Sequence, residues 1–396
     1  MIPRLKPYYR TEELKALFAL KGSGVAEFEE HFARAFHAGH ALTFNYGRSA
    51  LYAILKSQGI RNAEIILPAY TCVVVADAVV LSGNIPRFVD ITADGYNMDL
   101  DLLAEAVNER TGAIVATSLF GYPIDTDRVQ EIVRDAGRGI LLIQDCAQSF
   151  GVTHRGSPVC NQGDAAIFSL RMNKIISTIL GAIATTNRKD VFEKLKAYRD
   201  RHYRMPGLFS RMRRLFYVLS TYLVFSRTAY RFVNTLEIRG LIDAFTKSYS
   251  ETKIRFPSDA MELLTTSAAG LGMVQLGKYE DMIEQRRGIA AFYHKRLAHV
   301  RGLRLPPMME EATWSYYCPR VRNKGEVMRR MRSVGVQVGE VLEYAVPYMP
   351  LYNKYRDREF PNALACSRTT INLPVHPGLT EGDLNHITGH LERILS

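Results

Sequence analysis

The feature that most constrains the fold is an alternation of short apolar runs with helical patterns between about residues 40 and 190. The apolar runs are rich in β-branched and aromatic residues and are bounded by Gly, Pro or Asp, which is typical of strands. Strands that alternate with helices form a mainly parallel sheet covered on both faces, so we expect an α/β fold. Ligands of such sheets bind beyond the carboxyl ends of the strands. The expected strands are 64–70, 86–91, 113–120, 140–146 and 165–170.

Helical spacing fills two of the gaps between these strands, at 99–110 and 125–137. In the second segment, Asp125 or Asp127 can cap the helix start. The last hundred residues differ and predict a smaller α+β domain. We therefore expect a large domain over 1–290 and a small C-terminal domain over 291–396. The elements expected in the small domain are strands 315–321 and 369–376 and helices 324–336 and 380–395.

Charge and cysteine content limit the partners. The chain has 396 residues with 51 Lys+Arg against 40 Asp+Glu, a formal charge of +11, which favours anionic partners. It has no recognisable nucleic-acid-binding motif, so we expect no nucleic acid. Five cysteines without any CxxC pair predict a reducing compartment, no disulfide framework and no metal site. The mixed, polar N-terminus predicts no secretory signal, and thus a cytoplasmic protein.

The segment 201–256 stands apart as an apolar and basic insertion. Its uncharged core, 215–226, has 12 residues, fewer than the roughly 20 that a membrane-spanning helix needs. We expect one helix over 215–232. Two interpretations stay open: a helix buried against the enzyme or its twin subunit, and an interfacial helix on anionic lipid through 211–233. The basic residues that motivate the second are Arg211, Arg213, Arg214, Arg227 and Arg231.

Polar groups follow several of the expected strands. In 45–55 a glycine turn leads into a helix, whose N-terminal N–H groups suit a phosphate, and Arg48 and Ser49 would add donors. Asp145 ends an apolar strand, where a carboxylate needs a hydrogen-bonding or cationic partner, or else caps a turn. Lys174 follows the next strand, and no other charge occurs before Arg188.

Lys174 taken alone fits a surface lysine whose stem lies along apolar side chains. Taken with Asp145 and the glycine-led helix, it fits the requirements of pyridoxal 5′-phosphate (PLP). In such a site a lysine holds the cofactor aldehyde, an aspartate keeps the pyridine nitrogen protonated, and a helix end holds the phosphate.

An ordered set of motifs also carries a family resemblance. They include "YGRSAL", "EIILPAYTC", "PRFVDI", "SLFGYPIDTD", "QDCAQSFG", "GDAAIFSLRMNK" and "FPNALACSRTTINLPVHPGLTEGDL". Over nearly the whole chain except 201–256, the sequence resembles the DegT/DnrJ/EryC1/StrS aminotransferases. The resemblance implies a fold-type I PLP enzyme, homodimeric, that moves an amino group from an amino-acid donor, typically glutamate, to a keto sugar on a nucleotide.

The resemblance also implies roles for individual residues. Lys174 takes the Schiff-base position, where the dehydratase branch of the family has histidine, and Asp145 takes the pyridine-nitrogen position. Gln148 lies at the position packed near the cofactor ring, and Cys72 stands where the family usually has a stacking aromatic, with Tyr70 nearby. The phosphate positions are taken by Gly47, Arg48, Ser49 and Ser169.

Three departures concern the substrate side. The family's Gly-Glu-Gly-Gly is here 179–182, its tyrosine-proline-leucine-histidine stretch is "YAVPYM" at 344–349, and its partner-subunit asparagine is missing near Met261. They leave the acceptor open between a nucleotide-linked and a lipid-linked sugar. Two alternatives also remain: another PLP reaction of the sugar-dehydratase type, and a catalytically degenerate member with a membrane-associated or regulatory role. Retention of Asp145 and Lys174 argues against the second.

Overall fold

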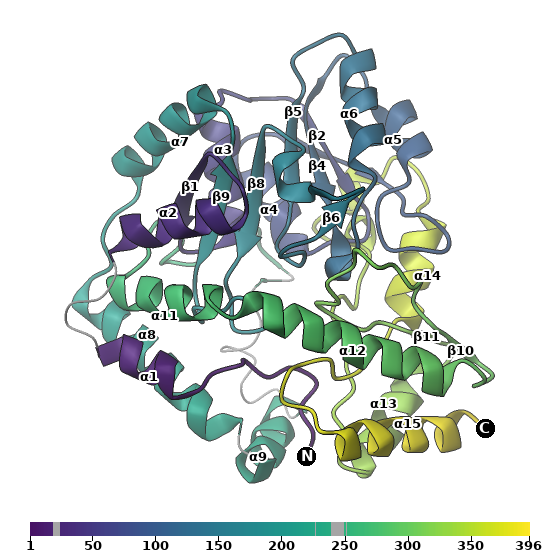
Figure 1. Ribbon diagram of the computed structural model, residues 1–396. Coiled ribbons are helices and arrows are strands. Elements are labelled where there is room, and N and C mark those ends of the chain that lie inside the picture. Colours follow the sequence, from purple (N-terminus) through teal and green to yellow (C-terminus); the bar gives the residue numbers. More distant parts are fainter. Residues whose placement is uncertain (19–23, 226, 239–248, 251) are drawn as a thin grey trace.

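The computed structural model describes residues 1–18, 24–225, 227–238, 249–250 and 252–396. Its centre is a seven-stranded sheet with the order β1-β9-β8-β5-β4-β2-β3 (Figure 1). All neighbours pair in parallel except β9, which is antiparallel to both β8 and β1, so the expected mainly parallel sheet is confirmed. The strands are β1 (His40–Phe44), β2 (Glu64–Pro68), β3 (Ile85–Val89), β4 (Thr111–Thr117), β5 (Leu141–Asp145), β8 (Ala165–Ser169) and β9 (Ala182–Thr186).

The five strands expected from the sequence are β2, β3, β4, β5 and β8, whereas β1 and β9 were not predicted. The expected helices 99–110 and 125–137 correspond to α5 and α6. Asp125 caps α6, because its carboxylate accepts a hydrogen bond from the Arg128 amide (3.0 Å). The helices around the sheet are α2 (Val25–Ala35), α3 (Gly47–Ser57), α4 (Val73–Leu81), α5 (Leu100–Ala106), α6 (Thr126–Asp135), α7 (Lys189–His202), α11 (Thr266–Leu276) and α12 (Tyr279–Leu297).

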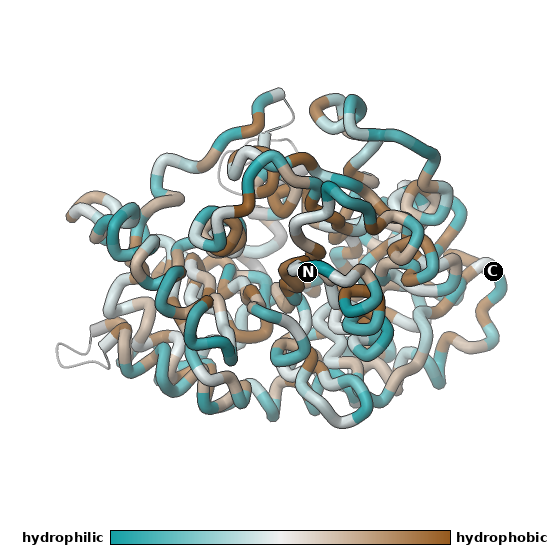
Figure 2. The backbone as a smooth tube through the Cα atoms, turned by 90° about the horizontal axis from the view of Figure 1, so that it is seen from above, coloured by the Kyte–Doolittle hydropathy of each residue, from teal (hydrophilic) through white to brown (hydrophobic). Residues whose placement is uncertain are grey.

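Both faces of the sheet are buried, and alternate residues of one strand divide between them. Leu67 and Val115 pack in one hydrophobic cluster with α3, α4 and the C-terminal elements. Ile66 and Ile114 pack in another cluster with α2, α5, α6 and α11. This two-sided burial explains why the strands read as nearly continuous apolar runs. In Figure 2 hydrophobic and hydrophilic residues alternate within many of the outer helices, as packing on one side requires.

The C-terminal elements differ from expectation in their strands. The segment 369–376 makes only single bridges, and 315–321 retains a two-residue strand, so two full strands were wrongly predicted. Pro319 and Pro374 lack the N–H that a ladder needs, which limits pairing in both segments. The expected helices are confirmed as α13 and α15. The elements are β10 (Leu303–Arg304), β11 (Arg320–Val321), α13 (Lys324–Ser333), α14 (Pro361–Thr369) and α15 (Glu381–Leu395).

The N-terminal arm, residues 1–10, lies against these C-terminal elements. Ile2 bridges Val336, and the His376 ring donates from Nε2 to the Pro3 carbonyl (3.1 Å). The arm leads into α1, which packs on α11. The remaining short elements are α1 (Thr11–Phe18), β6 (Thr153–His154), β7 (Ser157–Pro158), η1 (Leu119–Gly121), η2 (Val159–Asn161), η3 (Val346–Tyr348) and η4 (Asn353–Tyr355).

The insertion forms two helices, α8 (Leu208–Val224) and α9 (Arg227–Ile238), so the single helix expected over 215–232 is wrong. The two helices lie in the lower half of Figure 1, α8 next to α1 and α9 near the N-terminus. Serine 226 lies outside the described residues, as do the side chains of Arg227 and Arg231. Among the helices of the described ranges, none is both long and apolar enough to cross a membrane.

The face of α8 that packs on the protein is formed by Arg214, Val218 and Thr221. The opposite face is an apolar stripe that stays exposed. Its spacing of three and four residues puts these side chains on one side of the helix. The α8 stripe consists of Leu208, Phe209, Met212, Phe216 and Leu223.

Candidate active site

A cavity of about 330 Å³ lies where β5 and β8 end. Two sets of residues line it. The strand-end wall comes from the start of α3 and from the segments that follow β2, β5 and β8, and it includes Gly47, Arg48, Cys72, Asp145, Gln148, Ser169 and Lys174. The insertion wall comes from the N-terminal arm, the junction of α8 and α9, and the C-terminal elements, and it consists of Arg4, Leu5, Pro7, Phe225, Tyr230 and Gln337.

Asp145 is the last residue of β5 and is almost fully buried. Burial raises the pKa of its carboxyl group, and the Ala147 amide and the Lys174 ammonium oppose that rise. One carboxylate oxygen accepts the Ala147 N–H (3.0 Å). A buried carboxylate at a cavity wall favours a ligand that brings a positively charged N–H group.

Lys174 lies in the loop 170–181, which joins β8 to β9. Backbone hydrogen bonds close this loop: Leu170 N–H donates to the Gly181 carbonyl and Thr178 N–H to the Leu170 carbonyl, both at 2.8 Å. The Lys174 side chain is half-buried, and its Nζ lies 5.8 Å from the centroid of the Tyr316 ring. The amine therefore lines a cavity beside an aromatic ring rather than lying on an open surface.

The start of α3 forms a site suited to an anion. A Cβ on Gly47 would lie 3.9 Å from Cβ of Ser169, so glycine keeps the space between α3 and the end of β8 open. Arg48 is buried, with Nη1 4.0 Å from an oxygen of Asp77, and its burial lowers the pKa of the guanidinium. Helix N–H groups, a guanidinium and a hydroxyl together match the donors that a phosphate requires.

The Ser49 side chain points away from this site. Its hydroxyl donates to the Ala260 carbonyl (2.8 Å), and Ser49 is not among the residues that line the cavity. Two residues further along an α-helix, a side chain points about 200° away, so Ser49 faces away from Gly47. The structure thus contradicts the prediction that the Ser49 side chain adds a donor here.

The other predicted residues flank the cavity. Gln148 accepts the Phe120 N–H at Oε1 (3.1 Å), which fixes its side chain. Cys72 is half-buried and lines the cavity. Tyr70 is fully buried and donates its hydroxyl to the Leu342 carbonyl (3.2 Å), so it does not take the place of the missing aromatic.

The insertion wall was not predicted from the sequence. The rings of Phe225 and Tyr230 stack with their centroids 5.3 Å apart and their planes 23° apart. Tyr230 donates its hydroxyl to Oε1 of Gln337 (2.6 Å), and the Arg4 amide donates to the same oxygen (3.1 Å). Three segments far apart in the sequence therefore meet at one amide side chain.

Ion pairs fix α8 beside the cavity. Arg213 pairs with Asp259 and Arg214 with Glu262, each at 2.7 Å. Asp259 also accepts the hydroxyl of Tyr46 (2.9 Å), which lies directly before α3. The insertion is thus connected to the residues next to the anion site.

The lysine loop also contacts α8. Ile179 has a φ of +68°, a conformation that strains a β-branched residue. Its side chain is buried with Val218 of α8 and Leu271 of α11. This burial offsets the backbone strain and joins the loop to the insertion.

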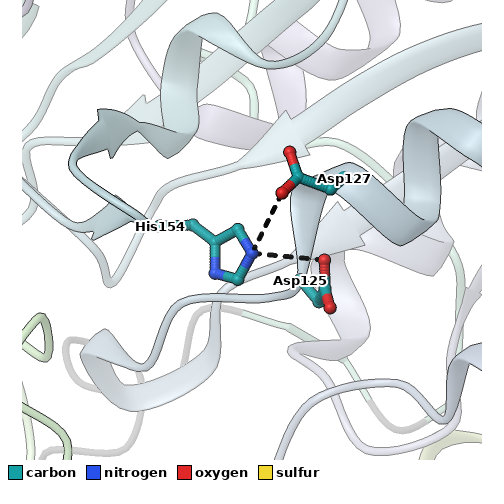
Figure 3. Close-up of side chains that lie close together, drawn as sticks. All are labelled: Asp125, Asp127 and His154. Atoms are coloured by element: carbon teal, nitrogen blue, oxygen red, sulfur yellow. Dashed lines mark ion pairs between the residues drawn. The ribbon is translucent and has the colours of Figure 1, made fainter.

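A separate cluster of carboxylates and a histidine lies at the start of α6 (Figure 3). His154 Nε2 lies 3.2 Å from an oxygen of Asp125 and 3.8 Å from one of Asp127. Asp125 is already the cap of α6, and Asp127 pairs with Arg155 (2.9 Å). These contacts indicate that the cluster stabilises the start of α6 and the β6–β7 hairpin.

The donor set of the strand-end wall fits PLP. The buried Asp145 carboxylate suits a protonated pyridine nitrogen, and the Lys174 amine suits an aldehyde. Gly47 leaves room for a phosphate between the first turn of α3 and Ser169. The cavity thus combines the three groups that this cofactor needs.

Comparison with solved structures shows the fold, and comparison with family models shows the class. The fold is similar to that of the sugar aminotransferase CalS13 from Micromonospora echinospora, with a TM-score of 0.78, 23% identity, and 99% of this chain and 100% of that one covered. The protein has the fold of the fold-type I PLP-dependent aminotransferases. The model of the DegT/DnrJ/EryC1/StrS aminotransferase family matches residues 9–214 and 233–392. The chain therefore belongs to this family of PLP-dependent aminotransferases.

Two relatives show how far the similarity extends. The chain is 26% identical over 386 residues to GDP-perosamine synthase of Caulobacter vibrioides, covering 94% of this chain and 91% of that protein. It is 25% identical over 394 residues to the spore coat polysaccharide biosynthesis protein SpsC of Bacillus subtilis, covering 95% and 91%. The similarity spans about nine tenths of each relative, and the family match has an internal gap at 215–232.

Proposed function

We propose that the protein transfers an amino group from L-glutamate to the keto carbon of a sugar held on a diphosphate carrier, for cell-surface polysaccharide or secondary-metabolite synthesis. The observation that carries this proposal is that buried Asp145 and Lys174 line the same cavity. Asp145 ends β5, and Lys174 follows β8. The relationship to GDP-perosamine synthase supports a nucleotide-linked sugar.

Each residue of the strand-end wall has a role in this proposal. PLP, when bound, supplies an aldehyde that accepts the amino group and a ring that withdraws electrons. Lys174 would hold the aldehyde carbon and would carry the proton taken from the donor Cα. Asp145 would keep the pyridine nitrogen protonated. The first turn of α3, Arg48 and Ser169 would bind the phosphate, and Gln148 and Cys72 would lie against the ring.

A lysine in this position also argues against the first alternative. The dehydratase branch of the family has histidine there, whereas transamination needs an amine that can both hold the aldehyde and carry a proton. A degenerate protein would have no need for the buried carboxylate, which burial makes unfavourable when ionised. We therefore favour amino transfer over dehydration and over a regulatory role.

We also propose that the enzyme acts as a homodimer in the cytoplasm. Five free cysteines, four of them buried, support a reducing compartment. Size-exclusion chromatography with light scattering tests the dimer, and a mass near that of the 44.8 kDa monomer would contradict it.

We propose that the α8 stripe contacts an anionic membrane surface. The support is the exposed apolar face of α8, a helix that carries the exposed Arg211 and follows the exposed Arg201 and Arg204 in the sequence, in a chain of charge +11. Arg213 and Arg214 are used in ion pairs within the protein, so fewer charges face outward than the sequence indicated. Each basic residue near such a surface contributes about 1 kcal/mol.

Cosedimentation with vesicles of phosphatidylserine and phosphatidylcholine at low and high salt tests this contact. We expect binding that weakens as salt rises. A dimer that stays in the supernatant at both salt concentrations would instead assign the stripe to contact between two copies of the chain.

A spectrum of the purified protein with PLP tests the reaction class. We expect a visible absorption band that is lost on addition of L-glutamate and returns on addition of 2-oxoglutarate. A band that does not respond to glutamate or to other amino acids would contradict amino transfer. The sugar half-reaction is then tested in reverse with GDP-perosamine, the compound in the name of the Caulobacter relative, as the source of the amino group.

A further inference from the structure

We infer that Phe225 and Tyr230 are specificity-determining residues for the amino acceptor and contact a flat or apolar face of its carrier. This inference rests on the proposed function, because it assigns one part of the same cavity to one of two substrates. It assigns no role to these rings in the reaction with the amino-acid donor.

The family match is the first support. The family model leaves residues 1–8 and 215–232 unmatched. Five of the six residues of the insertion wall lie in these two segments, and the sixth, Gln337, holds the two segments together through its side-chain oxygen. By contrast, every residue of the strand-end wall lies within the matched ranges. The cofactor side of the cavity thus lies within the family match, and five of the six residues on the other side lie outside it.

The rigidity of the two rings is the second support. Tyr230 is buried, stacks on Phe225 and is fixed by its hydrogen bond to Gln337. Phe225 directly follows α8, which is held by Arg213 and Arg214 at one end and by the contact of Val218 with Ile179 in its middle. Aromatic rings that are held in place this way present a preorganised surface, which favours selection among ligands.

The size of the two substrates is the third support. An amino-acid donor is small and reacts next to Lys174, within the strand-end wall. A sugar on a diphosphate carrier is far larger, so it must extend along other parts of the same cavity. The insertion wall supplies two rings, which favour a flat base or an apolar sugar or lipid face over an extended polar chain.

The test compares two half-reactions in single-turnover experiments on the PLP-loaded dimer. The variants are Phe225→Ala and Tyr230→Ala, and Tyr230→Phe separates the hydroxyl from the ring. The probes are L-glutamate for the donor side and GDP-perosamine for the acceptor side. We expect the ratio of rate constant to Kd for GDP-perosamine to fall about tenfold in both alanine variants, because each loses one aromatic contact. The same ratio for L-glutamate should change less than about twofold.

Phe232→Ala is the matched control, because this ring lies on the same helix as Tyr230 but is exposed to solvent. It should leave both half-reactions unchanged. Equal rates with GDP-perosamine in wild type and alanine variants, or an equal loss in both half-reactions, would overturn the inference. A wild-type enzyme that fails to react with glutamate would instead reject the proposed function, so the two failures are distinguishable.

Discussion

The two walls of the cavity are built differently. The strand-end wall is formed by strand ends and a helix start. Of its key residues, Asp145 ends β5 and Lys174 lies in the loop that follows the neighbouring strand β8. The insertion wall is formed by an N-terminal arm, a helix junction and one glutamine that meet from distant parts of the sequence. The first wall is restricted by the chemistry of one cofactor, whereas the second is free to vary with the substrate.

This difference separates what must be kept from what can change. A cofactor needs particular groups at particular places, so few residue types serve. A substrate surface needs only a complementary shape and contact, which many sequences supply. The four predictions that follow test whether the two walls are as separate as the structure indicates.

The largest effect should come from Lys174→Ala. We expect loss of the visible band and a fall of both half-reactions by more than about a thousandfold, because the group that carries the proton is gone. Reduction of the wild-type holoenzyme with borohydride, followed by peptide mass spectrometry, should place the cofactor on Lys174. A cofactor found on a different lysine would reject the assignment of this wall.

Asp145→Asn should have the next largest effect. The variant should bind PLP, but an amide does not favour a protonated pyridine nitrogen, so both half-reactions should fall about a hundredfold or more. Rates with glutamate and GDP-perosamine, measured at saturating PLP, test this. A loss confined to one substrate would show that Asp145 belongs to substrate binding, and that the division into two walls is wrong.

A smaller, pH-dependent effect should arise at His376. This ring is buried against the Pro3 carbonyl, and its pKa is lowered from the ordinary 6.5 to about 4. Burial is the main cause, Arg286 and Lys6 act in the same direction, and the hydrogen bond to Pro3 and the charge of Asp383 oppose. The unfolded chain therefore binds a proton below pH 6.5 that the native protein does not bind. Stability is lost as pH falls from about 6.5 to about 4, by about 3 kcal/mol in total.

Urea unfolding at several pH values tests this, with His376→Gln as the comparison. The glutamine variant should lose less stability over the same pH interval. Because His376 holds the N-terminal arm that carries Arg4, mild acid should first increase hydrogen exchange in residues 1–8 and leave 141–145 protected. Equal pH dependence in the two proteins would show that His376 does not hold the arm.

The smallest effect on the enzyme should come from the α8 stripe. Phe209 is 81% exposed, so Phe209→Ser should change the unfolding free energy by less than about 0.5 kcal/mol and leave both half-reactions intact. Vesicle binding should nevertheless weaken. Val218→Ser, on the buried face of the same helix, is the contrast and should cost about 2 kcal/mol. Unchanged vesicle binding in Phe209→Ser would remove this residue from the lipid contact.

The sequence predicted the sheet better than the cavity. Strands such as β2 and β5 are short apolar runs with clear ends, and the chemistry of PLP marks Asp145 and Lys174. The β8–β9 hairpin was missed because a 12-residue loop separates strands that no turn motif connects. Ser49 was misplaced because sequence proximity to Gly47 does not show which side of a helix a residue faces.

The insertion wall could not have been predicted from pattern alone. Arg4 and Tyr230 lie more than two hundred residues apart, and nothing in their local sequence marks them as neighbours. From the sequence, Phe225 was one of several aromatic residues in an apolar helix. Periodicity does not show where a helix is interrupted, so the junction of α8 and α9 at this residue was missed. The one signal in the sequence for a separate role of 201–256 was that the family motifs do not extend into this segment.

The left-handed backbone at Ile179 makes the stability of the lysine loop depend on the presence of the insertion. Isoleucine at this φ carries a strain of roughly 1–2 kcal/mol, which glycine would not. The strain is tolerated because Val218, on the insertion, covers the side chain. Without α8, Ile179 would keep its backbone strain and lose part of the apolar contact that offsets it. The two features are therefore energetically coupled, and the effects of changing each on stability should not be additive.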